Sequence, residues 1–473
     1  MKKLVAKNFF IYSFPSVISR FVPFLTLPIT TKYLNLPDFG YIAIFELCLI
    51  PFQVLIGFGP GYAINSTWYK INAEERKKLI FSLLLLAGSL CFFGGILIGS
   101  LSNLIFPLFS GSDWINIKFL LPYLFISAFA LVPGTIFTSW VIIEQKAILS
   151  TIVKSLHIIL TASGVLIAAI FTQDYKYIII ATVLANILTA LIQLVCLLRV
   201  SKVSIEKDIF INIYKICSPI YIRSFFNILR TQFDKIMVSK LFGASQFAIY
   251  NFSAKINNLF NEAGEHYQNA YDPILYKGLS NNNLDVKNFR QILFTWSYFI
   301  LLGLSIFIIF GQEIINIVTN GVFIDSYPLV LLYTCVIVIT LPFMGNAQVL
   351  IFNKETKYLL LITVIQTLII IICSVILIPR FGVSAGIFSL WLGTFVYFLL
   401  YFYKKRKLFK DYFIEKESLS YVLLYHLSIL LFFFNKTSIG YIVLGLLNIL
   451  MFTHFVIINK RIIKDISLKF LFK

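Results

Sequence analysis

The stretch SPIYIRSFFNILRTQFDKIMVSK, residues 218–240, holds charged side chains that could bind an anion in an apolar environment. Arg223, Asn227, Arg230 and Asp234 follow one another at i, i+4, i+7 and i+11, which places all four on one face of a helix. The rest of the stretch is apolar, and a charge at the centre of a bilayer costs roughly 2.5–3.5 kcal/mol. Guanidinium groups keep their proton and match phosphate and carboxylate oxygens. The spacing therefore predicts an anion-binding face inside a membrane.

Other polar residues lie within apolar runs in the same way. Arg20 is near the centre of the apolar run 9–31, and Lys255 lies in the run 245–274. Because hydrocarbon satisfies no polar group, such side chains must face one another or water. We therefore predict a central cavity whose substrate-binding residues are Arg20, Arg223, Asn227, Arg230 and Lys255. Candidates for ion coupling or gating are Glu46, Asp234 and Lys235.

Structural roles for the same residues remain open alternatives. Arg230 and Asp234 are four residues apart and could neutralise each other as a packing pair. Lys235 and Lys255 could extend their ammonium groups to the membrane surface. Glu46 could pair with Arg20 on a neighbouring helix.

The composition is that of an integral membrane protein made of helices. Of 473 residues, 59% are hydrophobic and 13% charged, and the mean hydropathy is +0.88. A soluble protein carries about twice that charged fraction. The net charge of +19 comes from short basic clusters between apolar runs, so we expect no nucleic-acid binding. The six cysteines and four histidines show no metal-ligand spacing, and we expect neither a metal nor a cofactor.

Apolar runs long enough to cross a bilayer recur along the whole chain. We predict an all-α polytopic protein of about fourteen transmembrane helices, at 9–31, 40–64, 78–101, 119–143, 148–171, 177–198, 211–239, 245–274, 291–317, 327–352, 358–379, 384–403, 418–434 and 439–459.

The basic residues predict the orientation in the membrane. With the N-terminus in the cytoplasm, the cytoplasmic segments hold 29 Lys and Arg residues, and the outer connections hold 6. Basic residues accumulate on the cytoplasmic side of membrane proteins. Both termini are therefore predicted to be cytoplasmic.

A short internal similarity suggests a repeat. KYLNLPDFGYIAIF from residue 32 aligns with KLFGASQFAIYNFS from residue 240, at an offset of 208. Six helices per repeat would give both copies the same topology, related by an axis along the membrane normal. We predict an N-lobe at 1–205, a C-lobe at 206–405, and two further helices with a cytoplasmic tail at 406–473.

Three stretches resemble the Wzx-type polysaccharide flippases of the multidrug/oligosaccharidyl-lipid/polysaccharide exporter superfamily. In LPITTKYLNLPDFGYIAIF, a Leu-Pro inside the helix precedes a basic outer end and a Phe-Gly. FDKIMVSKLFGASQFAIYNFSAK contains an Asp-basic pair, a Gly and an aromatic-rich helix. FGVSAGIFSLWLGTFVYFLLYFYKKRK is glycine-rich at its start and ends in a basic loop. The likeness covers essentially the full length.

The resemblance implies a flippase, not an enzyme, that moves undecaprenyl-pyrophosphate-linked oligosaccharide repeat units from the cytoplasmic to the outer leaflet. It implies alternating access between two lobes, and a place in lipopolysaccharide O-antigen or other surface polysaccharide biosynthesis in the bacterial inner membrane. The implied partners are the lipid-linked oligosaccharide and membrane lipid, with a polysaccharide polymerase and chain-length proteins as further candidates. A coupling ion, H⁺ or Na⁺, is an open question.

Three alternatives stay open. A flippase for lipid II or teichoic-type precursors shares the pyrophosphate carrier. A multidrug exporter of the same superfamily handles cations and would more naturally present acids than arginines. A membrane glycosyltransferase or polymerase would need paired catalytic carboxylates, which the outer connections do not show.

Overall fold

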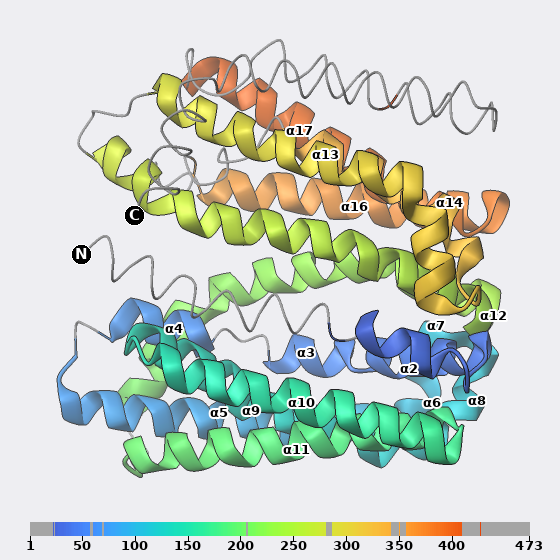
Figure 1. The fold of residues 1–473 in the computed structure, drawn as a ribbon. Coiled ribbons are helices and arrows are strands. Elements are labelled where there is room, and N and C mark those ends of the chain that lie inside the picture. Colours follow the sequence, from blue (N-terminus) through green and yellow to red (C-terminus); the bar gives the residue numbers. More distant parts are fainter. Residues whose placement is uncertain are drawn as a thin grey trace, which may run out of the picture. The chain divides into compact units, whose positions relative to one another are not determined.

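The computed structural model describes residues 22, 24–56, 60–68, 71–204, 207–280, 286–341, 350, 356–408 and 426. All regular elements in this part of the chain are helices (Figure 1). The predicted helices 418–434 and 439–459, and most of 9–31, lie outside these residues.

Eight described helical segments are long and apolar enough to cross a membrane. The main helices, of seven residues or more, are α2 Leu36–Cys48, α3 Ile50–Ile56, α4 Pro60–Thr67, α5 Ala73–Ser100, α9 Leu121–Ile143, α10 Ala147–Thr172, α11 Tyr175–Val200, α12 Lys207–Ser280, α13 Val286–Thr319, α14 Tyr327–Thr340, α16 Thr356–Phe381 and α17 Ser384–Leu408. Short elements connect them: α6 Ser102–Ile105, α7 Pro107–Ser110, η1 Gly111–Asp113, α8 Trp114–Ile117, η2 Lys118–Leu120 and η3 Ile324–Ser326.

In the region of the predicted helix 40–64, the segment Leu36–Val54 is long and apolar enough to cross a membrane, but its helix is interrupted once. The chain there forms α2 and α3, and then α4 after residues 57–59. Pro51 has no N–H to donate to Leu47, so the regular helical hydrogen-bond pattern is interrupted at this point. Leu49 N–H instead donates to Glu46 O, at 3.3 Å.

The predicted pair 211–239 and 245–274 corresponds to α12, which changes direction at Gly243. Its backbone there has φ 75° and ψ −179°, inside an otherwise helical segment. A positive φ favours glycine because it has no Cβ to clash with the backbone. The chain therefore reverses at this residue and returns as a second helical arm.

Contacts divide the chain into two compact units. One combines Met1–Asn251, Val318–Phe323 and Ile370–Gly386, and the other combines Phe252–Ile317, Ile324–Ile369 and Ile387–Lys473. The predicted lobe boundaries at 205 and 405 stay predictions.

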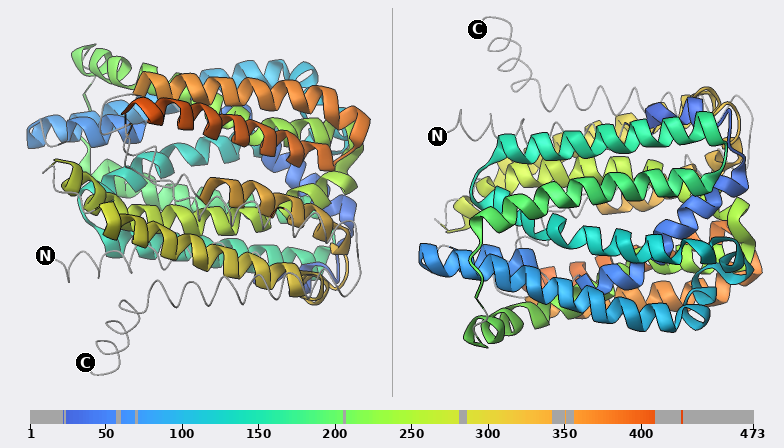
Figure 2. Two further views of the ribbon diagram at one scale, coloured as in Figure 1. Left: turned by 90° about the horizontal axis from the view of Figure 1, so that it is seen from above. Right: turned by 90° about the horizontal axis from the view of Figure 1, so that it is seen from below.

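Within the first unit, α10 and α11 run side by side, and α11 also packs on α9 (Figures 1 and 2). Side chains that point away from these contacts are large and apolar, such as Ile152 and Ile159 of α10 and Leu184 and Leu188 of α11. Such surfaces suit lipid contact.

The first unit has two ends at which helices are connected. We call one the Gly243 end; its connections are residues 31–35, 101–120, 240–244 and 320–323. The other, the Glu74 end, contains residues 71–74, 144–146 and 201–204.

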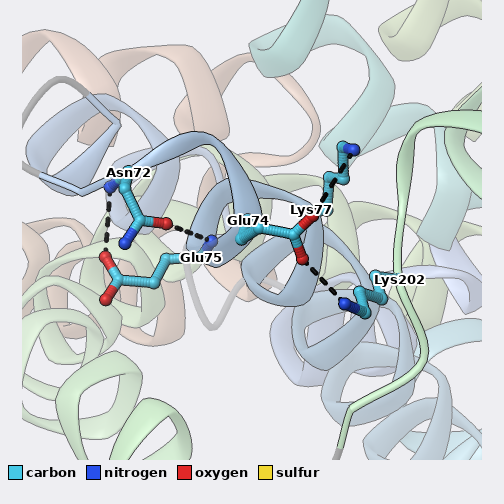
Figure 3. Close-up of polar contacts among 5 residues, drawn as sticks. All are labelled: Asn72, Glu74, Glu75, Lys77 and Lys202. Atoms are coloured by element: carbon cyan, nitrogen blue, oxygen red, sulfur yellow. Dashed lines mark hydrogen bonds and ion pairs between the residues drawn. The ribbon is translucent and has the colours of Figure 1, made fainter.

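At the Glu74 end, α5 begins with a capping box (Figure 3). The Asn72 side chain accepts from the Glu75 N–H at 2.9 Å, and the Glu75 side chain accepts from the Asn72 N–H at 3.1 Å. Beside it, Lys202 Nζ lies 2.8 Å from Glu74 Oε2. The two side chains of this ion pair are 56% and 58% exposed, so solvent and salt screen it.

These two interactions should differ in their effect on stability. Asn72→Ala leaves the Glu75 N–H without its side-chain acceptor and is expected to lower the free energy of unfolding by about 1 kcal/mol. Glu74→Gln removes the two screened ion pairs of Glu74, with Lys202 and with Lys77, and should shift the midpoint of thermal unfolding less than Asn72→Ala does. Both are measured on purified protein in detergent. A larger shift for Glu74→Gln than for Asn72→Ala would contradict this ranking.

Candidate functional site

Arg230 lies on the first arm of α12, where the sequence predicts the anion-binding face. Its side chain is half-buried, and its guanidinium donates to Asn227 Oδ1 at 2.7 Å. Asn227 is exposed, as is Thr231 one turn further along. The neutral amide orients the guanidinium without cancelling its charge. Arg230 and Asn227 thus lie together on a partly accessible face.

Asp234 is not the ion-pair partner of Arg230. Its carboxylate is fully buried, and Oδ2 accepts a hydrogen bond from the Tyr250 hydroxyl on the second arm of α12. A Cβ at Gly386, in α17, would lie only 2.8 Å from that hydroxyl oxygen. Asp234 therefore joins the two arms of α12 and does not neutralise the arginine. Lys235 is half-buried and donates to Gln232 Oε1 at 3.2 Å.

The Tyr250–Asp234 hydrogen bond should stabilise the fold. Tyr250→Phe would leave the buried carboxylate without this donor, and we expect it to reduce the free energy of unfolding by about 1–3 kcal/mol. Tyr250→Phe combined with Asp234→Leu should be less destabilised than Tyr250→Phe alone, because both polar partners are then removed. Thermal unfolding of the two variants in detergent tests this. An equal or larger loss in the combined variant would contradict it.

Glu46 and Gln53 share one exposed face. Among residues 36–54 they are the two exposed side chains, while most of their neighbours are buried or half-buried. On the second arm of α12, Lys255 and Asn258 are exposed beside the buried Ile256 and Asn257. Glu46 and Gln53 therefore form an accessible polar face in the first compact unit. Lys255 and Asn258 form one in the second.

Two predicted residues cannot be placed in detail. Arg20 lies outside the described residues. Arg223 occupies a helical position of α12, but its side chain is among those not described. Their assignment to the substrate site stays a prediction.

The structure reveals a polar stripe on α10 that the sequence prediction missed. Ser150, Lys154, His157 and Thr161 lie on the face opposite the exposed Ile152 and Ile159. Lys154 is inside α10. The Lys154 side chain forms no ion pair or hydrogen bond with any described residue. The signal was present, because the spacing i, i+4, i+7, i+11 is the same as in α12.

A second missed stripe lies on α11, with Thr182, Asn186, Thr189 and Gln193 at the same spacing. His157 Nδ1 lies 3.2 Å from Thr189 Oγ1, and Asn186 Nδ2 donates to Ser127 Oγ of α9 at 3.2 Å. These bonds join neighbouring helices, as polar side chains commonly do inside membranes.

The polar side chains of the described helix faces are of types that bind ligands through hydrogen bonds and charge. A guanidinium, amides and hydroxyls lie on faces of apolar helices, which suits an anionic or sugar-bearing ligand. Within the described residues no group of three or more His, Cys, Asp or Glu side chains could hold a metal ion.

The sequence profile of a family described as polysaccharide biosynthesis proteins matches residues 5–262. This match covers more than half of the 473 residues. The chain belongs to the polysaccharide biosynthesis protein family. A search of curated protein sequences gives no significant match.

Solved structures share the fold of this polysaccharide biosynthesis protein. The lipid II flippase MurJ in an inward closed conformation is 16% identical, with a TM-score of 0.74 over 96% of this chain and 99% of that one. An inward-facing multidrug resistance transporter of the MATE family and MOP superfamily is 14% identical, with a TM-score of 0.62 over 82% and 94% of the two chains. A MOP superfamily transporter from Pyrococcus furiosus is 14% identical, with a TM-score of 0.54 over 85% and 95%.

These likenesses confirm the all-helical transporter fold of the family member. The count of fourteen helices, the orientation of the termini and the cargo stay predictions.

Proposed function

We propose that this polysaccharide biosynthesis protein is a flippase for oligosaccharide repeat units linked to undecaprenyl pyrophosphate. It moves them from the cytoplasmic to the outer leaflet of the bacterial inner membrane, for a surface polysaccharide such as O-antigen. It acts without covalent catalysis. Its termini are cytoplasmic, and a polysaccharide polymerase and chain-length proteins act on the delivered units.

The observation that carries this proposal is Arg230. It lies half-buried in α12, and the neutral side chain of Asn227 holds its guanidinium. In a membrane protein of a polysaccharide biosynthesis family, an oriented guanidinium suits the pyrophosphate of a lipid-linked sugar. A cationic drug would be repelled by it.

The transport cycle that we propose is alternating access. Arg20, Arg223, Arg230, Asn227 and Lys255 hold the pyrophosphate and sugars, while the polyprenyl chain stays in lipid. A proton or a sodium ion drives the cycle. Glu46, exposed on its helix face, is the candidate for coupling, and Asp234 and Lys235 act in gating.

A second candidate cargo is lipid II. The MurJ fold covers 96% of this chain, and lipid II carries the same undecaprenyl pyrophosphate. The two cargoes differ in the sugar part, which the described residues do not distinguish.

Complementation in bacteria separates the cargoes. One strain lacks its own repeat-unit flippase and makes surface polysaccharide only when one is supplied. The other is depleted of its lipid II flippase. We expect this protein to restore surface polysaccharide in the first strain, with a matched repeat unit, and not growth in the second. Growth in the second strain alone would assign it to lipid II, and failure in both, with the protein present in the membrane, would overturn the proposal.

A further inference from the structure

Two polar side chains in connections at the Gly243 end bind segments that are distant in sequence. Asp113 lies in the connection between α5 and α9, and Asn320 follows α13. The two are 207 residues apart, close to the offset of 208 between the aligned stretches at 32 and 240. Asp113 and Asn320 therefore occupy corresponding places in the two halves of the proposed repeat.

The first contact joins Asp113 to the reversal of α12. Asp113 Oδ2 accepts from the backbone N–H of Ala244 at 2.7 Å. Ala244 directly follows Gly243 and begins the second arm of α12, so its N–H has no partner within that helical arm. A Cβ at Gly111, two residues before Asp113, would lie 2.7 Å from Lys240 O. The connection thus packs closely on the turn it caps.

The second contact joins Asn320 to the segment before α2. Asn320 Nδ2 donates to Pro28 O at 2.7 Å and to Thr31 Oγ1 at 2.9 Å. Thr31 donates its own hydroxyl hydrogen to Leu27 O at 2.7 Å, so its oxygen is free to accept. Asn320 has a φ of 48°, a left-handed conformation that asparagine tolerates better than most residues. In this conformation at the end of α13, the Asn320 amide reaches Pro28 and Thr31 in the segment before α2.

The two contacts are reciprocal. In each contact, a side chain from a connection in one half of the repeat binds backbone or side-chain groups of the other half. The groups that it binds lie at the turn between the first and the second helix of that other half. We call the Asp113–Ala244 contact and the Asn320–Pro28/Thr31 contact the two clasps.

Close packing surrounds the clasps. A Cβ at Gly40 would lie 2.1 Å from Ala244 O, so the start of α2 touches the reversal of α12 directly. Phe39 and Phe323 contact edge to face, with ring centroids 5.1 Å apart. At this end, residues 39–40 therefore pack directly against residues 244 and 323.

We propose that the two clasps close the extracytoplasmic mouth of the translocation path and must open together to release cargo. This rests on the proposed flippase function, because it assumes a path and a cytoplasmic location of the termini. Each clasp consists of one or two hydrogen bonds, which are weak enough to break in every cycle. The repeat makes them equivalent, so opening separates both at once.

Labelling of an introduced cysteine from outside tests the clasps without any lipid-linked sugar. The reporter is Gln53→Cys, because Gln53 is exposed and lies about 20 Å along α2 and α3 from Gly40. Intact cells are treated with a membrane-impermeant maleimide, and labelling of the protein without the reporter is subtracted. Lys118→Cys, in the exposed connection, serves as the surface control for labelling and folding.

The clasp variants are Asp113→Ala and Asn320→Gly. Glycine accepts the positive φ of residue 320, so this change removes the amide without straining the turn. Loss of the hydrogen bonds of one clasp should raise the ratio of open to closed protein about tenfold. Labelling of Gln53→Cys should therefore rise about five- to tenfold. The double variant should show about the product of the two effects.

Conservative variants separate the clasps from general damage. Asn320→Asp keeps the shape and the tolerance for positive φ but places a carboxylate against Pro28 O, which can only accept, so it should act like Asn320→Gly. Asp113→Asn retains an acceptor oxygen and should label close to wild type. Asn116→Ala removes a hydrogen bond to the Tyr41 hydroxyl at the same end, but within one half, and should change nothing.

Three results would overturn the proposal. The first is labelling of Gln53→Cys in the otherwise wild-type protein as fast as Lys118→Cys. The second is a change below twofold in both clasp variants. The third, an effect of only one clasp, would refute the reciprocal pairing. Because no cargo takes part, these results are independent of whether complementation succeeds.

Discussion

Arg230→Ala is expected to reduce delivery of surface polysaccharide by about ten- to hundredfold in cells that depend on this protein. The guanidinium would supply charge-assisted hydrogen bonds to the pyrophosphate, worth about 1.5–3 kcal/mol. Arg230→Lys should retain part of the activity, because an ammonium keeps the charge but loses the bidentate geometry. The measurement is surface polysaccharide per amount of protein in the membrane.

Two control variants show whether Arg230 acts through its position. Arg199→Gln removes an exposed arginine from the last turn of α11 and should leave delivery unchanged. Asn227→Ala removes the acceptor that orients Arg230 and should produce a smaller loss than Arg230→Ala. Wild-type delivery by a well-inserted Arg230→Ala protein would remove Arg230 from the transport path.

Gly40→Val should have the largest effect on the fold. The Cβ would lie 2.1 Å from Ala244 O and 2.8 Å from Ala244 Cα, and both atoms belong to the backbone. Neither can rotate away, so the start of α2 and the reversal of α12 must move apart. We expect a loss of about 3 kcal/mol in the free energy of unfolding, at the upper end for an overpacked contact. Thermal unfolding in detergent measures it.

Gly99→Ala is the matched control. It changes a glycine in the last turn of α5, and its Cβ would meet nothing within 4 Å. Alanine is the better helix former by about 1 kcal/mol, so this variant should unfold at the wild-type temperature or above. Equal unfolding temperatures for Gly40→Val and wild type would mean that the close approach at Ala244 is absent in the folded protein.

Much of the helical framework is predictable from the sequence, because hydropathy and capping are local. The predicted helices 148–171, 177–198 and 358–379 agree with α10, α11 and α16 within two residues at each end. In the predicted helix 40–64 the apolar segment Leu36–Val54 is present, but hydropathy did not show that proline interrupts the backbone hydrogen bonds between α2 and α3. Hydropathy reports burial in lipid and is insensitive to such a break.

The candidate site was predictable in its residue types and only partly in its contacts. The spacing placed Arg230 and Asn227 on one face, and they form a hydrogen bond. The same spacing allowed an ion pair between Arg230 and Asp234, which the structure does not form because Tyr250 supplies the partner of Asp234. Helical periodicity limits which residues share a face, and packing against other helices selects among them.

The sequence by itself determined that this chain is a helical membrane protein, where most of its helices lie, and which polar residues interrupt them. Only the tertiary structure decided which connections meet. Asp113 and Ala244 are 131 residues apart, and Asn320 and Pro28 are 292 apart. Contacts over such separations depend on how helices pack and on where the chain reverses, at Gly243 above all. A local sequence pattern does not show which residues so far apart in the sequence come into contact. The partners of Asp113 and Asn320 are therefore known only from the fold.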